Sequence, residues 1–169
     1  MPHSKDTIMA SHAILLLCLA VVLPVIYADG LGRGFGDDIN WKTLDAGLKE
    51  SKDLNKPLML IIHKSWCGAC KALKPKFADS SEIKELSEKF VMVNVEDNEE
   101  PSDSKYTPDG GYIPRILFLD STGTVRTELI NENGNPQYKY YYPEATSVVK
   151  SMKKAADVLI ESKAGVDEL

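Results

Sequence analysis

The sequence predicts an α/β fold in which a mixed β-sheet is flanked by helices. Helical patterns alternate with short apolar runs at 58–63 and 90–96, and a third run at 115–120 is followed by a turn and a further strand pattern. A strand–helix–strand unit requires parallel pairing through a right-handed crossover, whereas a hairpin is antiparallel. The sheet should therefore contain both kinds of pairing.

The first half of the domain contains two expected helices and a strand between them. Apolar residues recur among charged ones over 41–54, which indicates an amphipathic helix that the Asn-Lys-Pro sequence at 55–57 ends. The apolar run 58–63 fits a strand that is buried on both faces. In the helical stretch 68–90, Pro75 removes a backbone donor and clashes with the preceding turn. We therefore expect this helix to be kinked or divided.

The second half of the domain supplies the remaining strands and a last helix. The run 90–96 is the second strand of the parallel unit. Residues 115–120 and 124–130 are separated by a short turn that contains Gly123, so we expect an antiparallel hairpin. The last helix should extend from about 143 to 162, and its buried stripe is expected to contain Val148, Val149, Met152, Ala156, Val158 and Leu159.

Both ends of the chain are expected to lie outside the folded domain. Residues 1–28 contain an apolar segment too short to span a membrane comfortably, so we interpret them as a cleaved secretory signal peptide; an uncleaved anchor is the alternative. Residues 29–38 contain four glycines and should form a flexible or loosely packed segment. The folded domain is then expected at 39–162, and residues 163–169 form a C-terminal tail.

The tail ends in a sequence that matches a localisation signal. Val166, Asp167, Glu168 and Leu169 are similar to the address by which a receptor returns proteins to the endoplasmic reticulum, although Lys or His is commoner at the first position. A chance ending is the alternative. Signal peptide and tail together predict a protein of the endoplasmic reticulum lumen that has the retrieval receptor as a partner and no membrane span in its mature chain.

Composition excludes one class of partner. The formal net charge is -5, the pI is near 5.2, and no run of Lys or Arg is combined with aromatic residues. Nucleic acid is therefore not an expected partner.

Cys67 and Cys70 form a Cys-x-x-Cys pair, a spacing that occurs in four kinds of site. A structural bridge across so small a loop would stabilise the fold by only roughly 2 kcal/mol before strain is subtracted. A closed zinc site needs four ligands, whereas the chain without its signal peptide offers these two cysteines and His63, so no metal is expected. A cysteine hydrolase needs a distant histidine as base, and His63 is poorly placed for that role.

A redox couple has a positive physical basis. Cys67 is expected at the start of a helix, where unpaired N–H groups and the helix dipole favour thiolate over thiol. Cys67 would exchange with a substrate disulfide, and Cys70, one turn into the helix and less exposed, would resolve the mixed disulfide.

Two motifs resemble the thioredoxin superfamily, and the chain as a whole resembles its anterior-gradient group. "SWCGACKALKP" (65–75) is similar to the active-site helix of that superfamily, and "GGYIPRILFL" (110–119) is similar to the segment that holds its cis-proline. The resemblance implies a thioredoxin-like domain, a redox disulfide between Cys67 and Cys70, and a substrate-binding surface made of Trp66, Gly68, Ala69, Ile113 and Pro114.

The function implied is that of a thiol–disulfide oxidoreductase. Client proteins with thiols or disulfides and glutathione are the expected partners, and no resident cofactor is expected. The alternative is a client-binding or escort protein with little turnover, because some members of the anterior-gradient group have only one active-site cysteine.

This chain departs from the superfamily pattern around Cys70. Ile61 stands where many of these enzymes have a buried carboxylate, and Met92 stands where a buried lysine is frequent. The proton acceptor for Cys70 is therefore open, with water, Glu96 and His63 as candidates.

Two further segments have open interpretations. The acidic segment 96–111 is interpreted as a solvated loop in preference to a calcium site, because it lacks the spacing of a known calcium loop. The tyrosines of 138–142 are expected to be half-buried, with an exposed aromatic surface as the alternative.

Overall fold

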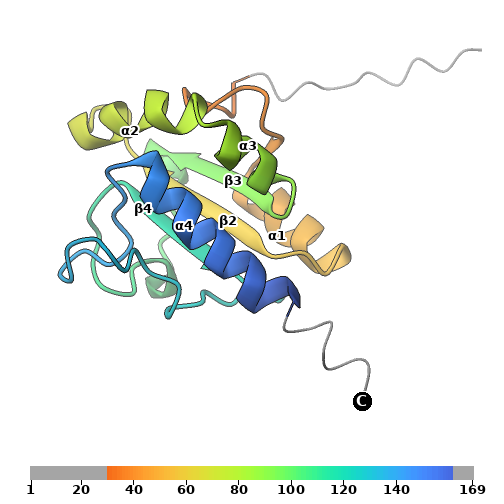
Figure 1. The fold of residues 1–169 in the computed structure, drawn as a ribbon. Helices are drawn as coiled ribbons and strands as arrows, with labels where there is room; N and C mark the ends of the chain where they lie inside the picture. The colour runs from red at the N-terminus through yellow and green to blue at the C-terminus, as the bar shows by residue number, and fades with distance from the viewer. Residues whose placement is uncertain (1–29, 162–169) are drawn as a thin grey trace, which may run out of the picture.

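The computed structural model describes residues 30–161, in which a central sheet carries helices on both faces (Figure 1). The proposed signal peptide and the tail residues Val166, Asp167, Glu168 and Leu169 lie outside the described residues. Within 30–161, no helix has both the length and the apolar character needed to cross a membrane.

The sheet has four strands in the order β1-β3-β2-β4. β3 pairs in parallel with both β1 and β2, and β4 pairs with β2 in the antiparallel direction, so the expected mixed sheet is confirmed. His63 at the end of β2 lies opposite Glu96 at the end of β3. These two polar residues therefore lie at the same end of the sheet. The strands are Trp41–Lys42, Leu58–His63, Val91–Glu96 and Arg115–Leu119.

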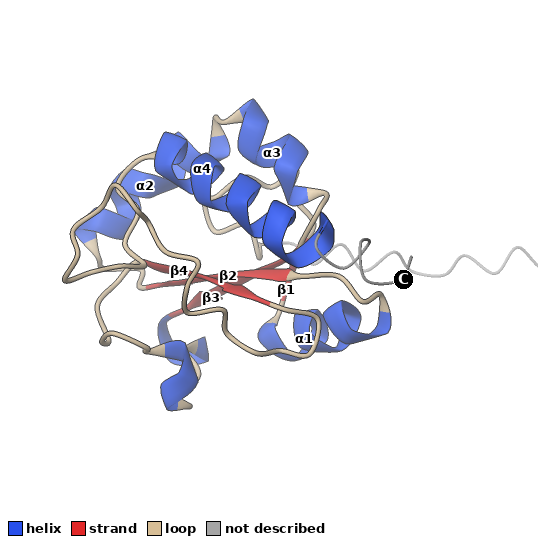
Figure 2. Ribbon diagram, turned by 60° about the horizontal axis from the view of Figure 1, so that its bottom comes forward, coloured by secondary structure: helices blue, strands red, loops and turns tan. Residues whose placement is uncertain are grey.

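The helices divide unequally between the two faces. Helices α2, α3 and α4 cover one face and α1 covers the other (Figure 2). Met59 and Ile61 of β2 belong to the core under α2, α3 and α4, whereas the alternating residues Leu58 and Leu60 belong to the core under α1. The helices are α1 Leu44–Asp53, α2 Gly68–Ala78, α3 Ser81–Ser87 and α4 Ala145–Ala156, which continues as a π-helical turn over Asp157–Glu161.

The start of the first helix was predicted too early. Trp41 and Lys42 form the edge strand β1, and α1 begins only after Thr43, whose hydroxyl accepts the N–H of Ala46. The two-residue strand leaves too short a pattern to be recognised in sequence.

The division of the second helix lies beyond the proline. Pro75 is inside α2, which continues to Ala78, and the break falls at Asp79 and Ser80. The hydroxyl of Ser80 accepts the N–H of Ile83 and so caps the start of α3. The expectation of a divided helix is confirmed, but a side-chain cap sets the new start.

The hairpin expected between 115–120 and 124–130 forms only next to its turn. Val125 bridges Leu119 in the antiparallel direction, and the amide of Arg126 donates to the carbonyl of Phe118 at 2.8 Å, after which the chain leaves the sheet. The amide of Ile116, which a longer hairpin partner would have bound, donates to the carbonyl of Tyr140 at 3.0 Å. A distant segment therefore occupies the beginning of the edge of β4.

Residues 30–38 are packed more closely than we expected. Phe35 is fully buried in the core under α2, α3 and α4, and its ring contacts Phe77. The indole N–H of Trp41 donates to the carbonyl of Gly36 at 2.7 Å. One buried aromatic residue thus anchors this glycine-rich segment to the domain.

Candidate functional site: a cysteine pair at a helix start

Cys67 occupies the N-cap position of α2. Its backbone is extended, and its sulfur accepts the N–H of Cys70 at 3.2 Å, so one of the unpaired amides of the first helical turn points at this sulfur. Both cysteines are free thiols. Cys67 is 7% exposed and Cys70 is fully buried, so Cys67 is the more accessible of the two sulfurs.

The environment of Cys70 disfavours its thiolate. Burial is the largest cause, the contact with Cys67 adds to it, and together they raise the pKa of Cys70 to about 12. Cys70 therefore needs help to lose its proton at neutral pH.

The segment before β4 lies beside the cysteines. The peptide bond between Ile113 and Pro114 is cis, as expected, and the Cys67 sulfur lies 3.9 Å from the carbonyl oxygen of Ile113. Pro114 is buried and Ile113 is half-buried. The fold thus brings together two motifs that are far apart in the sequence.

The residues around Cys67 differ in exposure. Trp66 is 72% exposed, Gly68 is also exposed, and Ala69 is half-buried. A side chain added at Gly68 would meet nothing within 4 Å, so the approach to Cys67 is open on this side.

Arg115 fixes the loop that holds the cis-proline. Its guanidinium is fully buried and donates to the backbone carbonyls of Tyr106 and Tyr112. Its Nη2 lies 2.5 Å from Glu100 Oε1, and the other oxygen of Glu100 binds the Lys64 ammonium at 2.5 Å. None of the sequence motifs above includes this arginine.

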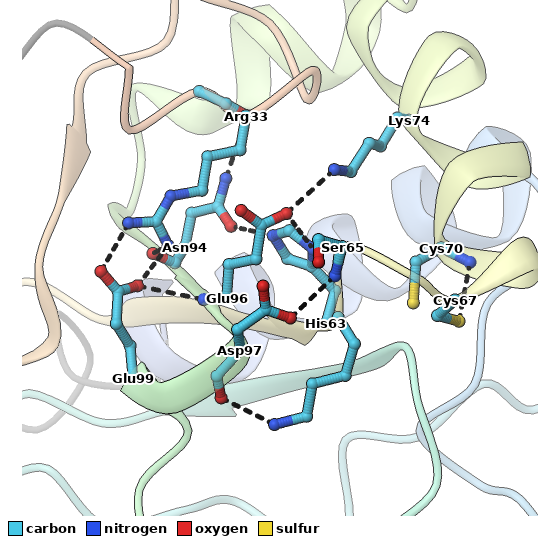
Figure 3. Close-up of polar contacts among 12 residues, drawn as sticks. Arg33, His63, Ser65, Cys67, Cys70, Lys74, Asn94, Glu96, Asp97 and Glu99 are labelled. Atoms are coloured by element: carbon cyan, nitrogen blue, oxygen red, sulfur yellow. Dashed lines mark hydrogen bonds and ion pairs between the residues drawn. The ribbon is translucent and has the colours of Figure 1, made fainter.

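The acidic segment 96–111 is exposed or half-buried except at Tyr106, which fits the interpretation as a solvated loop, but its first side chains have partners. Asp97 has a positive φ of 53°, and its carboxylate accepts the N–H of Ser65 at 2.9 Å (Figure 3). This bond lowers the pKa of Asp97 below its usual range. Glu99 forms an ion pair with Arg33. These contacts tie the approach to the cysteines to the end of β3.

A buried histidine ends β2, four residues before Cys67. His63 has no exposed surface, and its Nε2 lies 2.7 Å from Asn94 Oδ1. Its Nδ1 lies 3.4 Å from Glu96 Oε1, in a geometry that makes no hydrogen bond. Glu96 Oε1 instead accepts from the Lys74 ammonium at 3.2 Å. Burial is the main cause that lowers the pKa of His63.

Two tyrosine rings contact each other next to the segment that holds the cis-proline. The rings of Tyr112 and Tyr138 meet edge to face at 4.9 Å, and the Tyr112 hydroxyl donates to Asp109. Tyr140 is buried, whereas Tyr138 is 44% exposed. Both interpretations of 138–142 are thus met in part, because most of its tyrosines pack inward and one faces solvent.

The positions where the superfamily has charged residues are apolar here. Ile61 and Met92 are buried in the core under α2, α3 and α4. In the part of the chain that the structure describes, no three His, Cys, Asp or Glu side chains are grouped in a way that would hold a metal ion.

The fold and this site define a thioredoxin-like protein. A family model described as thioredoxin-like matches residues 40–121. Among solved structures, an oxidoreductase named DsbH is similar with a TM-score of 0.51 at 21% identity, over 71% of this chain and 85% of that chain. A thioredoxin from Thermus thermophilus has a TM-score of 0.50 at 14% identity, over 70% of this chain and 88% of its own. These structural likenesses concern the fold.

Sequence relatives narrow the class. Anterior gradient protein 3 of Xenopus tropicalis is 42% identical over 131 residues, which are 76% of this chain and 79% of the relative. Anterior gradient protein 2 homolog of Homo sapiens is 40% identical over 130 residues, which are 76% of this chain and 73% of the relative. The chain belongs to the anterior gradient family of thioredoxin-like proteins.

Proposed function

We propose that this protein is a thiol–disulfide oxidoreductase in which Cys67 attacks and Cys70 resolves. One observation carries the proposal: the Cys67 sulfur lies at the start of α2, accepts the Cys70 amide at 3.2 Å and lies 3.9 Å from the Ile113 carbonyl. The amide stabilises negative charge on the sulfur, and the carbonyl beside it is available to a bound peptide.

The substrates are disulfides or thiols of client proteins, and glutathione is the small-molecule redox partner. Trp66 and Ile113 flank Cys67 with apolar surface, which suits a peptide substrate. We place the protein in the endoplasmic reticulum lumen on the basis of the signal-like segment 1–28 and the tail at 166–169, with the retrieval receptor as a further partner. Within its family, the paired cysteines and this tail make it similar to thioredoxin-domain-containing protein 12.

Two serine variants test the reaction. Cys67→Ser should abolish exchange with a peptide disulfide, whereas Cys70→Ser should accumulate a mixed disulfide on Cys67 that mass spectrometry detects. Full exchange activity in Cys67→Ser would refute the assignment. The two variants are matched to each other, because each removes one sulfur of the same pair.

A second candidate function is client binding without turnover. Trp66, next to Cys67, and Tyr138, whose ring contacts that of Tyr112, are exposed aromatic residues, and such residues commonly anchor protein interfaces. Client capture that survives removal of both cysteines and is lost in Trp66→Ala would favour this function. Capture that is lost with the cysteines would favour the oxidoreductase.

A further inference from the structure

Lys74 is held on the side of α2 that faces the sheet. It follows Cys70 by one helical turn, so both side chains lie on the same face of the helix. Its side chain is only 19% exposed, and its ammonium lies 3.2 Å from Glu96 Oε1 (Figure 3). The ammonium also lies 5.7 Å from the centre of the Phe35 ring. A lysine that extended into solvent would make neither contact.

Because of the tautomer of His63, the Glu96 carboxylate accepts a hydrogen bond from Lys74 and none from the histidine. The amide nitrogen of Asn94 donates to the carbonyls of Leu31 at 2.8 Å and Gly32 at 3.0 Å, so its oxygen is the atom that faces His63. The Nε2 atom of neutral His63 must then carry the hydrogen, and Nδ1 has none. Nδ1 therefore donates nothing to Glu96 Oε1, and this oxygen accepts from Lys74.

We infer that Lys74, held by Glu96, is the positioning residue for the resolving step, and that its cation stabilises the thiolate of Cys70. The inference rests on the proposed function and extends it. Burial raises the pKa of Cys70 most, and a backbone hydrogen bond from Lys64 and the Lys74 ammonium both oppose this rise. The sheet supplies no cation from Ile61 or Met92, which are apolar and buried.

The step can be written for glutathione disulfide. The Cys67 thiolate attacks one sulfur, the Cys67–glutathione bond forms, and the first glutathione leaves as a thiolate that takes a proton from water. Cys70 then loses its proton to solvent, and its thiolate attacks the Cys67 sulfur. The Cys67–Cys70 bond forms and the second glutathione leaves, so the protein loses two electrons and the glutathione disulfide gains them. Lys74 acts only on the second step.

Stopped-flow fluorescence of the exposed Trp66 separates the two steps. The first rate rises with glutathione disulfide concentration, and the second is the limiting rate at high concentration. At pH 7, Lys74→Met should lower the limiting rate about 3- to 10-fold, which corresponds to a loss of about 0.5 to 1 pKa unit of thiolate stabilisation. It should leave the concentration-dependent rate unchanged within about 2-fold, and Lys74→Arg should restore the limiting rate.

Lys71→Met is the matched control, because Lys71 is on the same helix next to Cys70 but is exposed. It should change neither rate by more than about 2-fold. If Lys74→Met does not fold, as judged by circular dichroism, Lys74→Gln takes its place. A limiting rate in Lys74→Met equal to that of the unmodified protein would overturn the inference. A rate in Lys74→Arg as low as in Lys74→Met would assign the effect to packing and would overturn it too.

Failure of the proposed function gives a different result. In that case Cys70→Ser would not accumulate glutathione on Cys67, and the first rate would be absent in every variant. If Lys74→Met completes both steps at the rates of the unmodified protein, the inference about Lys74 is wrong and the proposed function still stands.

Discussion

Arg115, the residue after the cis-proline, lies with its Nη2 2.5 Å from Glu100 Oε1. The arginine is fully buried, whereas the glutamate side chain is 23% exposed. The same guanidinium binds the carbonyls of Tyr106 and Tyr112, so it connects the loop before β4 to the end of the acidic segment. The position of Ile113 beside Cys67 therefore depends on a buried charge.

Replacing Arg115 by methionine should destabilise the protein. The change removes an ion pair and leaves two backbone carbonyls without their donor, which we expect to cost about 2–4 kcal/mol of unfolding free energy. Urea denaturation measures this cost. Arg126→Met is the control, because Arg126 pairs with Glu128 at the surface and should cost no more than about 0.5 kcal/mol. Equal midpoints for the two variants would contradict a structural role of Arg115.

The sheet and most helices could be predicted because their signals are local. Continuous apolar runs mark β2, β3 and β4, and an apolar stripe marks α4. The outer edge of β4 could not be predicted in the same way. Before the short hairpin at Phe118 and Leu119, its partner is the backbone of Tyr140, and a single long-range hydrogen bond to Ile116 leaves no periodic pattern in the sequence.

The candidate site was predictable where a motif carried it. Cys67 and Pro114 lie in short motifs whose geometry is set by a helix start and a cis peptide bond. The supporting residues Asn94 and Arg115 were not predicted, because the role of each depends on where its partners lie in space. The signal that could have identified them is a polar residue within an apolar strand, as Asn94 is, or at the start of one, as Arg115 is.

The resolving step should depend steeply on pH. The pKa of Cys70 is raised to about 12, so at any pH well below that value its thiolate fraction rises tenfold for each pH unit. The limiting rate of oxidation by glutathione disulfide should therefore increase close to tenfold per unit between pH 6 and about 8. A rate that levels off near pH 7 would show that the mixed disulfide at Cys67 gives Cys70 a much lower pKa.

The stability of the protein should fall in mildly acidic solution because of His63. Burial lowers the pKa of this imidazole below its unfolded value of 6.5. Below pH 6.5 the unfolded chain binds a proton that the folded chain resists, so the unfolding free energy decreases as pH falls toward the lowered value. Above pH 6.5 both states are neutral at this residue, and it adds no pH dependence.

His63→Gln separates this effect from that of the carboxylates. Between pH 5 and 7 the unfolding free energy of this variant should be nearly constant, whereas that of the unmodified protein declines toward pH 5. Asp97 and Glu99 have pKa values held low by Ser65 and Arg33, so their share of stability is lost only in more acidic solution. The same slope in both proteins over pH 5–7 would exclude His63 as the cause.

Gly47 should not tolerate even a methyl group. It lies within α1 on the side that faces the sheet, and a Cβ there would lie 2.3 Å from Val93 Cγ2 and 3.4 Å from Leu58 Cδ1. Alanine favours a helix over glycine by about 1 kcal/mol, but overpacking a core typically costs about 1–3 kcal/mol. We expect a net loss of about 1–2 kcal/mol in Gly47→Ala, measured by urea denaturation.

Gly68→Ala provides the matched control for Gly47, because it is also a helical glycine but a Cβ there would meet nothing within 4 Å. The helix preference of alanine then acts without a steric cost, so this variant should be as stable as the unmodified protein or more stable. A Gly47→Ala protein that gains as much stability as Gly68→Ala would mean that Val93 moves aside freely. In that event, close packing of α1 on β3 would not explain why glycine occupies this position.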